Sequence, residues 1–199
     1  MTILMPKQNE FESVPAGSYT AVCYRVIDLG TQFSPFYQKS SHKIMISWEL
    51  SEKMKDGRPF SIHKRYTLSA GKNAALRKDL ESWRGRAFTE EELGTFDIGR
   101  LIGVGCMIGV STRTEGGQTY SDVSSIMQLP KDIPSPTLEN EPFYLSLKEF
   151  KQDLYDKLSD GMKAVIAKSP EYQELKGGHK VEQNTPDAHD GFEDSNIPF

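Results

Sequence analysis

The spacing of apolar residues changes twice between residues 16 and 129, and this double change constrains the fold more than any other feature. Five segments are expected to be strands, which are 16–30, 43–50, 59–68, 101–110 and 120–129. Apolar side chains recur at every second position in 43–50, 59–68 and 101–110, and 16–30 is rich in β-branched and aromatic residues between two glycines. Between the third and fourth of the five segments, Leu76, Leu80 and Trp83 recur at the spacing of a helix. A period of two is typical of strands and one of 3.6 of helices. The sequence therefore predicts three strands, a helix and two more strands.

This order of elements predicts a mainly β, five-stranded OB-fold barrel over residues 14–131, with a helix between strands 3 and 4. Glycines 103, 105 and 109 share one face of the fourth strand, which suits the tight curvature of a small barrel. A sandwich of similar strands is the alternative, but it would not need the helix. A second short helix is expected at 89–93, where Thr89 can cap the first turn.

Strand 43–50 shows the expected division into faces most clearly. Its core-facing residues are predicted to be Ile44, Ile46, Trp48 and Leu50, and its outward residues Lys43, Met45, Ser47 and Glu49. A loop is expected at 30–43 and a turn at the Asp-Gly pair 56–57. Cys23 and Cys106 each lie in an apolar strand, which predicts two buried thiols and a reducing cytoplasm.

The regions outside the barrel have a different composition. Residues 1–13 form a polar N-terminal arm, and residues 132–144 are a Pro-rich linker. A helical extension is expected over 145–176, with one helix at 145–169 or two broken at Gly161. Its apolar stripe is Leu147, Phe150, Leu154, Leu158 and Met162. Residues 177–199 have no periodic pattern and are expected to be a disordered acidic tail.

Several classes of function are disfavoured by the residue patterns. The four histidines are scattered and no Cys-x-x-Cys motif exists, so no metal site is expected. There is no Gly-x-Ser-x-Gly motif, and the glycines of the fourth strand do not match a dinucleotide-binding pattern. Asp28, Glu49, Asp97 and Asp122 lie on different elements, which disfavours a metal-dependent nuclease. We expect no catalytic residues, no cofactor and no small-molecule substrate.

Neither a membrane-spanning segment nor a signal peptide is expected from the sequence. The longest nearly apolar run, 101–110, is shorter than the roughly 18–20 residues of a membrane helix and carries several glycines. The N-terminus lacks the basic start and apolar stretch of a signal peptide. The expected location is the cytoplasm.

Charge is distributed unevenly along the chain, whose formal net charge is −4. Residues 181–199 hold five acidic residues and no Lys or Arg, whereas residues 1–180 hold 24 basic and 23 acidic residues. Within the body, residues 53–86 carry ten Lys or Arg against three acidic residues. The pattern indicates a basic region in the barrel and a tail of opposite charge.

Basic and aromatic residues together predict binding of single-stranded nucleic acid, since phosphates need counter-charge and every base offers a face for stacking. The predicted DNA-contacting residues are Phe33, Phe36, Tyr37 and Lys39 in the first loop, Lys43, His63, Lys64 and Arg65 on or beside the outer face of strands 2 and 3, Arg84 and Arg86 after the helix, and Arg113 and Tyr120 at the last hairpin. The three loop aromatics either stack on bases or pack against the barrel wall. Trp83 is expected in the core by its helix phase.

The chain resembles single-stranded DNA-binding proteins, and more narrowly those of tailed bacteriophages. The resemblance lies in "VPAGSYTA" (14–21), "DLGTQ" (28–32), "ISWEL" (46–50), "KRYTLS" (64–69), "LRKDLESWRGRAFTEEE" (76–92) and the terminal "DSNIPF". It implies a protein that coats single-stranded DNA in phage replication, recombination or repair, in the cytoplasm of an infected bacterium.

The end of the chain is similar to the tail of bacterial single-stranded DNA-binding proteins, which finish in Asp-Ile-Pro-Phe after an acidic run. This chain has Asn196 at the position of the family's Asp. The similarity implies that the tail recruits replication or repair proteins of phage or host through Asp190, Glu193, Asp194, Ile197, Pro198 and Phe199. Two alternatives stay open: an adaptor whose barrel is only a scaffold for the tail, and an RNA-binding or strand-annealing protein.

Overall fold

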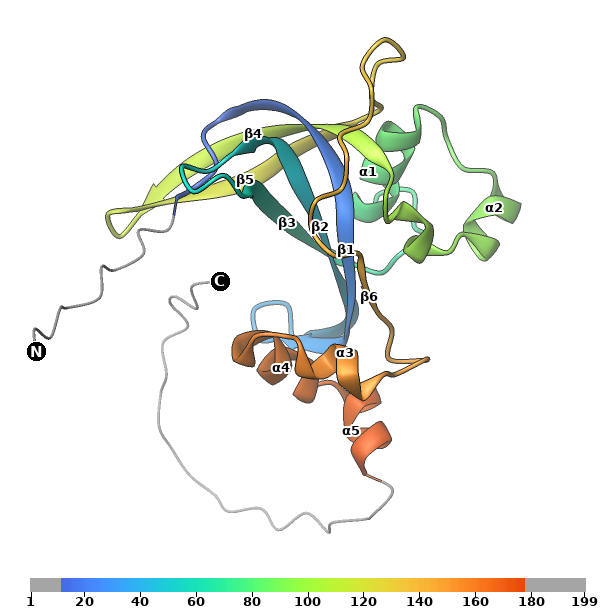
Figure 1. Cartoon of the computed structure of the whole chain (residues 1–199). Coiled ribbons are helices and arrows are strands. Elements are labelled where there is room, and N and C mark those ends of the chain that lie inside the picture. The colour runs from blue at the N-terminus through green and yellow to red at the C-terminus, as the bar shows by residue number, and fades with distance from the viewer. Residues whose placement is uncertain (1–11, 178–199) are drawn as a thin grey trace, which may run out of the picture. The chain divides into compact units, whose positions relative to one another are not determined.

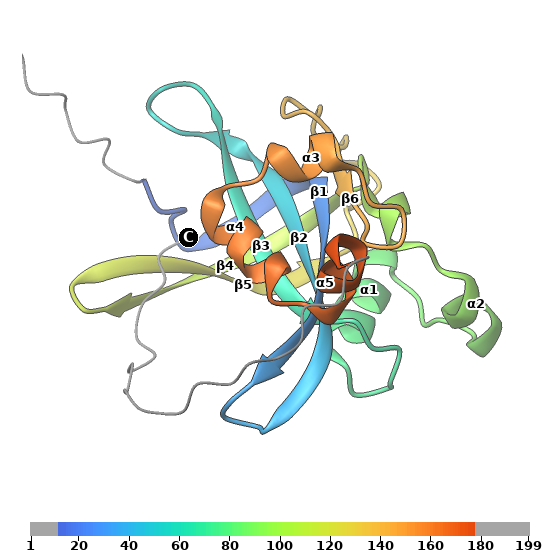
Figure 2. The ribbon, with the colours of Figure 1, turned by 90° about the horizontal axis from the view of Figure 1, so that it is seen from below.

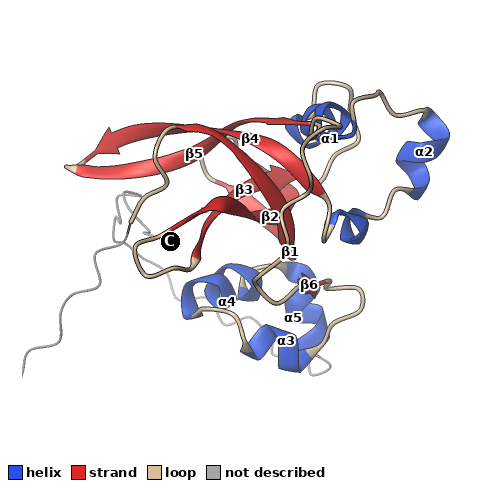
Figure 3. Ribbon diagram, turned by 45° about the horizontal axis from the view of Figure 1, so that its top comes forward, coloured by secondary structure: helices blue, strands red, loops and turns tan. Residues whose placement is uncertain are grey.

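The protein is mainly β, and its computed structural model describes residues 12–177 (Figures 1 and 3). The strands are β1 Gly17–Ser34, β2 Lys39–Lys53, β3 Pro59–Thr67, β4 Gly105–Glu115, β5 Gln118–Met127 and β6 Phe143–Leu145. The helices are α1 Ala75–Arg84, α2 Glu90–Thr95, α3 Gln152–Asp156, α4 Asp160–Ala167 and α5 Pro170–Lys176, and a 3-10 turn, η1, spans Ile98–Leu101. The predicted sequence of three strands, a helix and two strands is confirmed.

The strands form one antiparallel sheet in the order β3-β2-β1-β4-β5, with β6 paired to β1. β1 and β4 are in register from Gly17 opposite Val110 to Val22 opposite Gly105. The β4–β5 ladder has an irregularity between Gly109 and Val110. The described sheet has one strand more than the sequence predicted, because β6 forms where the predicted linker meets the predicted helical extension. The sheet does not close on itself.

The chain divides into two compact units. The first, here called the sheet unit, contains the residues up to Ile27 together with Ile44–Tyr144. The second, here called the hairpin–helix unit, contains Asp28–Lys43 and the residues from Leu145 onward. β1 and β2 each contribute to both units, whereas α1 and α2 belong to the first and α3 to α5 to the second.

The core of the sheet unit forms around two tryptophans, one from β2 and one from α1. The rings of Trp48 and Trp83 are 5.7 Å apart, and both side chains are buried. Leu76 and Leu80 are also buried, so the predicted helix stripe is confirmed. The Trp83 indole N–H donates to the Gly105 carbonyl at 2.9 Å, which satisfies the polar edge of a core ring.

The two helices of the sheet unit end and begin as their sequences indicate. Gly85 follows α1 with a φ of 72°, in the left-handed region, so a residue with a side chain would be strained here. α2 begins with a reciprocal capping box between Thr89 and Glu92, which confirms the predicted capping role of Thr89.

Both cysteines are buried in the sheet unit as unpaired thiols, in agreement with the sequence prediction. Burial raises the pKa of the Cys23 thiol to about 12. Burial, followed by the proximity of Cys23, likewise raises the pKa of Cys106. Both thiols are therefore protonated at neutral pH and act as apolar core atoms.

The prediction that β2 is buried on one face only is wrong. Ile44, Ile46, Trp48 and Leu50 are buried as expected, but the opposite face, consisting of Met45, Ser47 and Glu49, is buried too. The Glu49 carboxylate accepts hydrogen bonds from the Glu139 and Asn140 backbone N–H groups at 2.6 and 2.8 Å, and from the Asn140 side chain at 2.6 Å. The predicted linker thus contacts β2 at Glu49, and Met45 is buried rather than on an exposed outer face.

The hairpin–helix unit differs from its prediction in two respects. Residues 30–43 are not a loop, because β1 runs to Ser34 and β2 begins at Lys39, leaving a turn of only four residues (Figure 2). The helical region has three short helices rather than one helix or two. The helical conformation is interrupted at Lys157–Ser159 and again before Pro170. Ser159 and Ser169 cap the helices that follow, α4 and α5, whereas Gly161 lies inside α4.

The apolar stripe of the helical extension is confirmed in part. Leu147, Leu158 and Met162 are buried in the unit, whereas Phe150 and Leu154 are only half-buried. Ile166 of α4 is fully buried as well. These side chains give the three short helices a common core, since single helices of this length are marginal in water.

Candidate nucleic-acid interface

The tip of the β1–β2 hairpin exposes three aromatic side chains, Phe33 near the end of β1 and Phe36 and Tyr37 in the turn. Phe33, Phe36 and Tyr37 have 59%, 86% and 76% of their surface accessible. The sequence left open whether these rings stack on bases or pack against the barrel wall, and all three are exposed among the described residues. Lys39 at the start of β2 is also exposed, and Lys43 further along the strand is half-buried.

The backbone of the turn is held by its own side chains. Gln38 has a φ of 48°, in the left-handed region, and its side-chain amide donates to the Pro35 carbonyl at 2.6 Å. The rings of Phe36 and Tyr37 meet edge to face with centroids 4.8 Å apart. The two most exposed rings are therefore placed next to each other on a closed turn.

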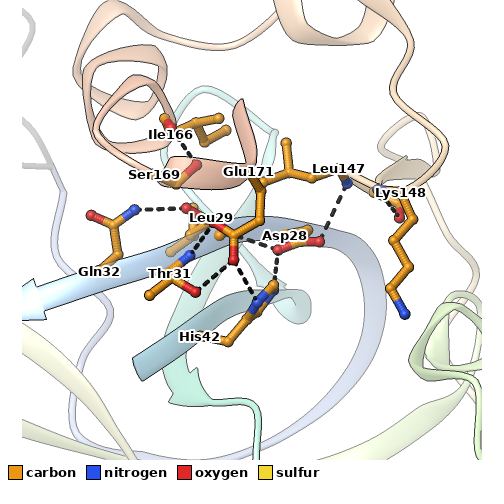
Figure 4. Close-up of polar contacts among 12 residues, drawn as sticks. Asp28, Leu29, Thr31, Gln32, His42, Leu147, Lys148, Ile166, Ser169 and Glu171 are labelled. Carbon is orange, nitrogen blue, oxygen red and sulfur yellow. Dashed lines mark hydrogen bonds and ion pairs between the residues drawn. The ribbon is translucent and has the colours of Figure 1, made fainter. Parts of the chain in front are cut away.

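A polar cluster fixes the base of this hairpin to α5 (Figure 4). Nε2 of His42 lies 2.6 Å from Oδ1 of Asp28, and Nδ1 lies 3.3 Å from Oε1 of Glu171. Asp28 also accepts hydrogen bonds from the backbone N–H groups of Gly30 and Leu147, at 2.9 and 3.3 Å. One imidazole thus connects the two strands of the hairpin with the helical part of the same unit.

Glu171 completes the cluster by accepting two hydrogen bonds from Thr31, at 2.8 Å from the backbone N–H and 2.5 Å from the hydroxyl. Partial burial of the Glu171 carboxyl disfavours its ionised form. The hydrogen bonds from Thr31 and the proximity of His42 outweigh this effect and place the pKa of Glu171 below its ordinary value. The carboxylate is therefore ionised at neutral pH and holds the hairpin.

The sheet unit carries a second group of candidate residues. His63 and Arg65, both predicted DNA contacts, are exposed on β3. Partial desolvation lowers the pKa of the His63 imidazole, and the positive charges of Arg65 and then of Arg25 lower it further, against an opposing contribution from Asp122. His63 is therefore neutral at pH 7 in a cationic environment.

Arg25, on β1, was not among the predicted site residues. Its guanidinium carbon lies 5.2 Å from the centre of the Tyr24 ring and 5.3 Å from that of Phe143. Its Nε is buried without a hydrogen-bond partner among the described residues. An arginine inside the apolar run "AVCYRVIDL" was the signal that could have identified it.

Two predicted phosphate contacts, Arg84 at the end of α1 and Arg86 just after it, are already paired with a carboxylate. Arg84 and Arg86 lie 2.9 and 2.6 Å from Oε1 of Glu92, and the Arg84 guanidinium also lies 4.1 Å from the centre of the Phe88 ring. Hydrogen bonds from Arg86, then from Arg84 and the Thr89 backbone, lower the pKa of Glu92 to about 2. This pairing gives the two arginines a role in holding α2 to α1.

The remaining predicted cations of the sheet unit are also paired. Lys64 shares the face of β3 that carries Ile62 and Tyr66, rather than lying at the edge of the outer face, and its ammonium group lies 2.8 Å from Asp79. Arg113 forms ion pairs with Asp122 at 2.9 Å and with Glu115. Its guanidinium carbon is also 4.8 Å from the centre of the Tyr120 ring, which stands opposite on β5.

The predicted site residues therefore fall into separate groups. Phe33, Phe36, Tyr37, Lys39 and Lys43 belong to the hairpin–helix unit, and the others belong to the sheet unit. The predicted partner-binding residues Asp190, Glu193, Asp194, Ile197, Pro198 and Phe199 lie outside the described residues.

Comparison of the chain with models of known protein families gives no match, and comparison with curated proteins gives none either. Within residues 12–177, no three His, Cys, Asp or Glu side chains are arranged so that they could hold a metal ion. Over the same residues, no helix has the length and apolar character needed to cross a membrane.

Proposed function

We propose that the protein binds single-stranded DNA without sequence preference and without catalysing a reaction. The observation that carries this proposal is the exposure of Phe33, Phe36 and Tyr37 together at the tip of the β1–β2 hairpin. Apolar rings gain nothing from water, and a group of them on a closed turn indicates a ligand that covers them. Base stacking is worth roughly 1–3 kcal/mol per base and tolerates every sequence, because all bases have a π face.

The topology of the sheet supports an OB fold for this function. The strand order β3-β2-β1-β4-β5, with α1 between β3 and β4, is the order of an OB barrel. β3 and β5, at the two ends of this path, have Cα atoms within 8 Å of each other. We propose that the sheet is an OB barrel with a covered outer face on β2.

Counter-charge for the phosphates comes from fewer residues than the sequence indicated. Lys39 and Lys43 belong to the hairpin–helix unit and Arg25 and Arg65 to the sheet unit, where His63 adds charge only when it is protonated. Neutralising three or four phosphates gives a slope of about −2 to −3 for log affinity against log salt concentration on single strands. A complex insensitive to salt would contradict this part of the proposal.

The biological role follows from the resemblance of the sequence to phage single-stranded DNA-binding proteins. In this role the protein protects single strands during phage replication, recombination or repair in the cytoplasm of the host. The tail residues Asp190, Glu193, Asp194, Ile197, Pro198 and Phe199 recruit replication or repair proteins. An acidic segment guides the approach, and a terminal apolar group supplies the anchor.

One gel-shift series tests the function directly. The full chain is titrated into oligonucleotides of equal length: oligo-dT, oligo-dC, a mixed DNA strand, the same sequence as RNA, and the DNA duplex. The proposal predicts similar affinity for the three DNA strands and much weaker binding to the duplex. Equal or tighter binding of RNA would favour an RNA-binding or strand-annealing protein instead.

The pairing of Lys64, Arg84, Arg86 and Arg113 with carboxylates favours a second candidate function. In this alternative the protein is an adaptor, whose folded part is a scaffold and whose tail docks on replication or repair proteins. Removing residues 187–199 separates the two functions. DNA binding persists or tightens if the first is correct, whereas no binding activity of either kind remains if the protein is only an adaptor.

A further inference from the structure

An open depression lies on the helical part of the hairpin–helix unit, away from every predicted DNA contact in the sequence. It is lined by residues 148–152, just before and at the start of α3, and by Leu175 and Lys176 at the end of α5. Its volume is about 630 Å³, which is in the range of surface sites that hold a ligand. The depression is therefore a candidate binding site of its own.

Positive charge is concentrated in this depression, although the region around it is neutral. Residues 145–176 hold six lysines and six acidic residues, yet three of the lysines and only one acidic residue, Glu149, line the depression. These lysines, Lys148, Lys151 and Lys176, are exposed, and among the described residues no carboxylate forms an ion pair with them. Three cations without a counter-charge suit an anionic ligand.

Apolar side chains stand beside these cations and are held in place by an aromatic cluster. The Phe150 ring lies 5.6 Å from the rings of both Tyr155 and Tyr172, and the two tyrosines stack with centroids 4.9 Å apart. The Lys176 ammonium group lies 5.8 Å from the centres of the Phe150 and Tyr172 rings. Phe150 is half-buried, and Leu175 has 47% of its surface exposed. Cations next to fixed apolar surface are the combination that holds single strands, through phosphates and bases respectively.

The polar cluster that holds the aromatic hairpin also holds the helix that lines the depression (Figure 4). Glu171, in the first turn of α5, accepts hydrogen bonds from Thr31 at 2.8 and 2.5 Å and lies 3.3 Å from Nδ1 of His42. Leu175 follows Glu171 by four residues in the same helix, which places it about 6 Å further along the axis. The hairpin tip and the depression are therefore attached to one cluster within one unit.

The hairpin tip is near enough to the depression for one strand of DNA to reach both. Phe36 follows Thr31 by five residues, and Tyr37 precedes His42 by five. Five residues span at most about 18 Å, which limits the distance from the cluster to the tip. With the length of α5 added, the tip and the depression lie within roughly 35 Å of each other, and about ten stacked nucleotides cover that length. A strand of this size is within the range of about 4–16 nucleotides that one OB fold binds.

We propose that the depression is a second contact site for single-stranded DNA, which continues the strand bound at the hairpin tip. This inference rests on the proposed function and extends its binding surface to the helical part of the chain. Lys148, Lys151 and Lys176 contact phosphates, whereas Phe150 and Leu175 contact bases. A DNA strand suits the site better than an acidic protein segment, because a strand that occupies the exposed rings of the tip can enter the depression as well.

Strand length and salt distinguish this contact from the one at the tip. The double variant Lys148→Ala/Lys151→Ala should weaken binding of oligo-dT of about 20 nucleotides about tenfold, and should make its salt dependence less steep by about 1.4, because each phosphate contact contributes about 0.7 to the slope. Binding of oligo-dT of about five nucleotides, which is too short to reach both sites, should change by less than about twofold. The matched variant Lys163→Ala/Lys168→Ala removes the same charge outside the depression and should leave both affinities within about twofold of the wild type. Fluorescence anisotropy over a range of salt concentrations measures all four quantities.

NMR of the ¹⁵N-labelled full chain tests the same contact without a substitution. The long strand should shift the backbone amide signals of Phe150, Gln152 and Leu175 together with those of the hairpin tip. The short strand should shift only the signals of the tip. Signals in the depression that respond to oligo-glutamate but not to the long strand would assign the site to an acidic protein segment, which overturns the inference.

The outcomes separate this inference from the proposed function. If the wild type binds both strands and Lys148→Ala/Lys151→Ala behaves like its matched variant, the second contact site is wrong, whereas DNA binding at the tip stands. An equal loss for both strand lengths would also overturn the second site, because the lysines would then act only through the overall charge of the protein. If the wild type binds neither strand, the proposed function fails together with the inference.

Discussion

The side chains that could bind a ligand are mostly paired within the fold in one unit of the protein and exposed in the other. In the sheet unit, four of the predicted DNA-binding cations, Lys64, Arg84, Arg86 and Arg113, form ion pairs with nearby carboxylates. In the hairpin–helix unit, three aromatic rings at the tip of the β1–β2 hairpin are exposed. Lys148, Lys151 and Lys176 of the same unit line an open depression and have no carboxylate partner among the described residues. Binding capacity that the fold itself does not use is therefore concentrated in the second unit.

This difference matters because a paired charge has less to offer a ligand. An arginine that already contacts a carboxylate must give up that contact, or bring the negative charge along, before it can bind a phosphate. An exposed ring or lysine has no such cost. Side chains without a use in the fold are thus better indicators of a binding surface than the local density of basic residues.

The largest expected effect is that of removing the aromatic rings of the turn. The triple variant Phe33→Ala/Phe36→Ala/Tyr37→Ala should weaken binding of oligo-dT by more than about 100-fold, because each ring contributes roughly 1–3 kcal/mol of stacking. Fluorescence anisotropy with a labelled oligonucleotide measures the change. The matched control is Leu68→Ala/Val104→Ala/Ile133→Ala, which removes three exposed apolar side chains from the sheet unit. A similar loss in both variants would remove the distinction between the units.

Sequence patterns were sufficient for the elements that depend on local periodicity. The strand and helix order, the buried stripe of α1 and the capping box at Thr89 all follow from residues close together in the chain. The two buried faces of β2 could not be predicted in this way. The carboxylate of Glu49 has its partners 90 and 91 residues away in a segment that has the composition of a linker.

The same limit applies to the candidate site. The three aromatics of the turn were identified from their spacing in the sequence, but their exposure depends on the fold. The pairing of Arg113 with Asp122 depends on the β4–β5 register, and that of Arg86 with Glu92 on how the chain turns between α1 and α2. A count of basic residues over 53–86 contains none of this information.

The second largest expected effect is on stability. It tests whether the buried polar contacts of the sheet unit stabilise the folded protein. Glu49→Ala should lower the free energy of unfolding by about 3 kcal/mol, because it leaves two backbone N–H groups and an amide without their acceptor. Urea denaturation followed by tryptophan fluorescence measures this loss. The control Glu52→Ala removes an exposed carboxylate from the same strand and should change stability by less than about 0.5 kcal/mol. Equal effects would show that the segment over β2 contributes little.

A smaller effect should link DNA affinity to pH through His63. The pKa of His63 is lowered in the folded protein, so the imidazole is neutral at pH 7, and a phosphate placed beside it would raise that pKa. Binding would then take up a proton, and affinity should rise about threefold as the pH falls from 7.5 to 5.5. Anisotropy titrations of the wild type and of His63→Gln at both pH values measure the linkage. If the wild type and His63→Gln respond equally to pH, β3 does not contact the DNA.

The smallest effect should come from a cation that the fold already uses. Arg86→Ala should change affinity for single-stranded DNA by less than about twofold, because its charge is offset by Glu92. Hydrogen bonds from Arg86 and Arg84 lower the pKa of Glu92 to about 2, so the carboxylate is ionised and the pairing persists at neutral pH. Lys39→Ala is the matched comparison, since this exposed lysine forms no ion pair within the described residues, and it should weaken binding about threefold to fivefold. Glu92→Gln should act in the opposite direction and tighten binding, because it releases Arg84 and Arg86 together. If Arg86→Ala weakened binding more than Lys39→Ala, paired cations would contribute to the site, and the distinction between the two units would fail.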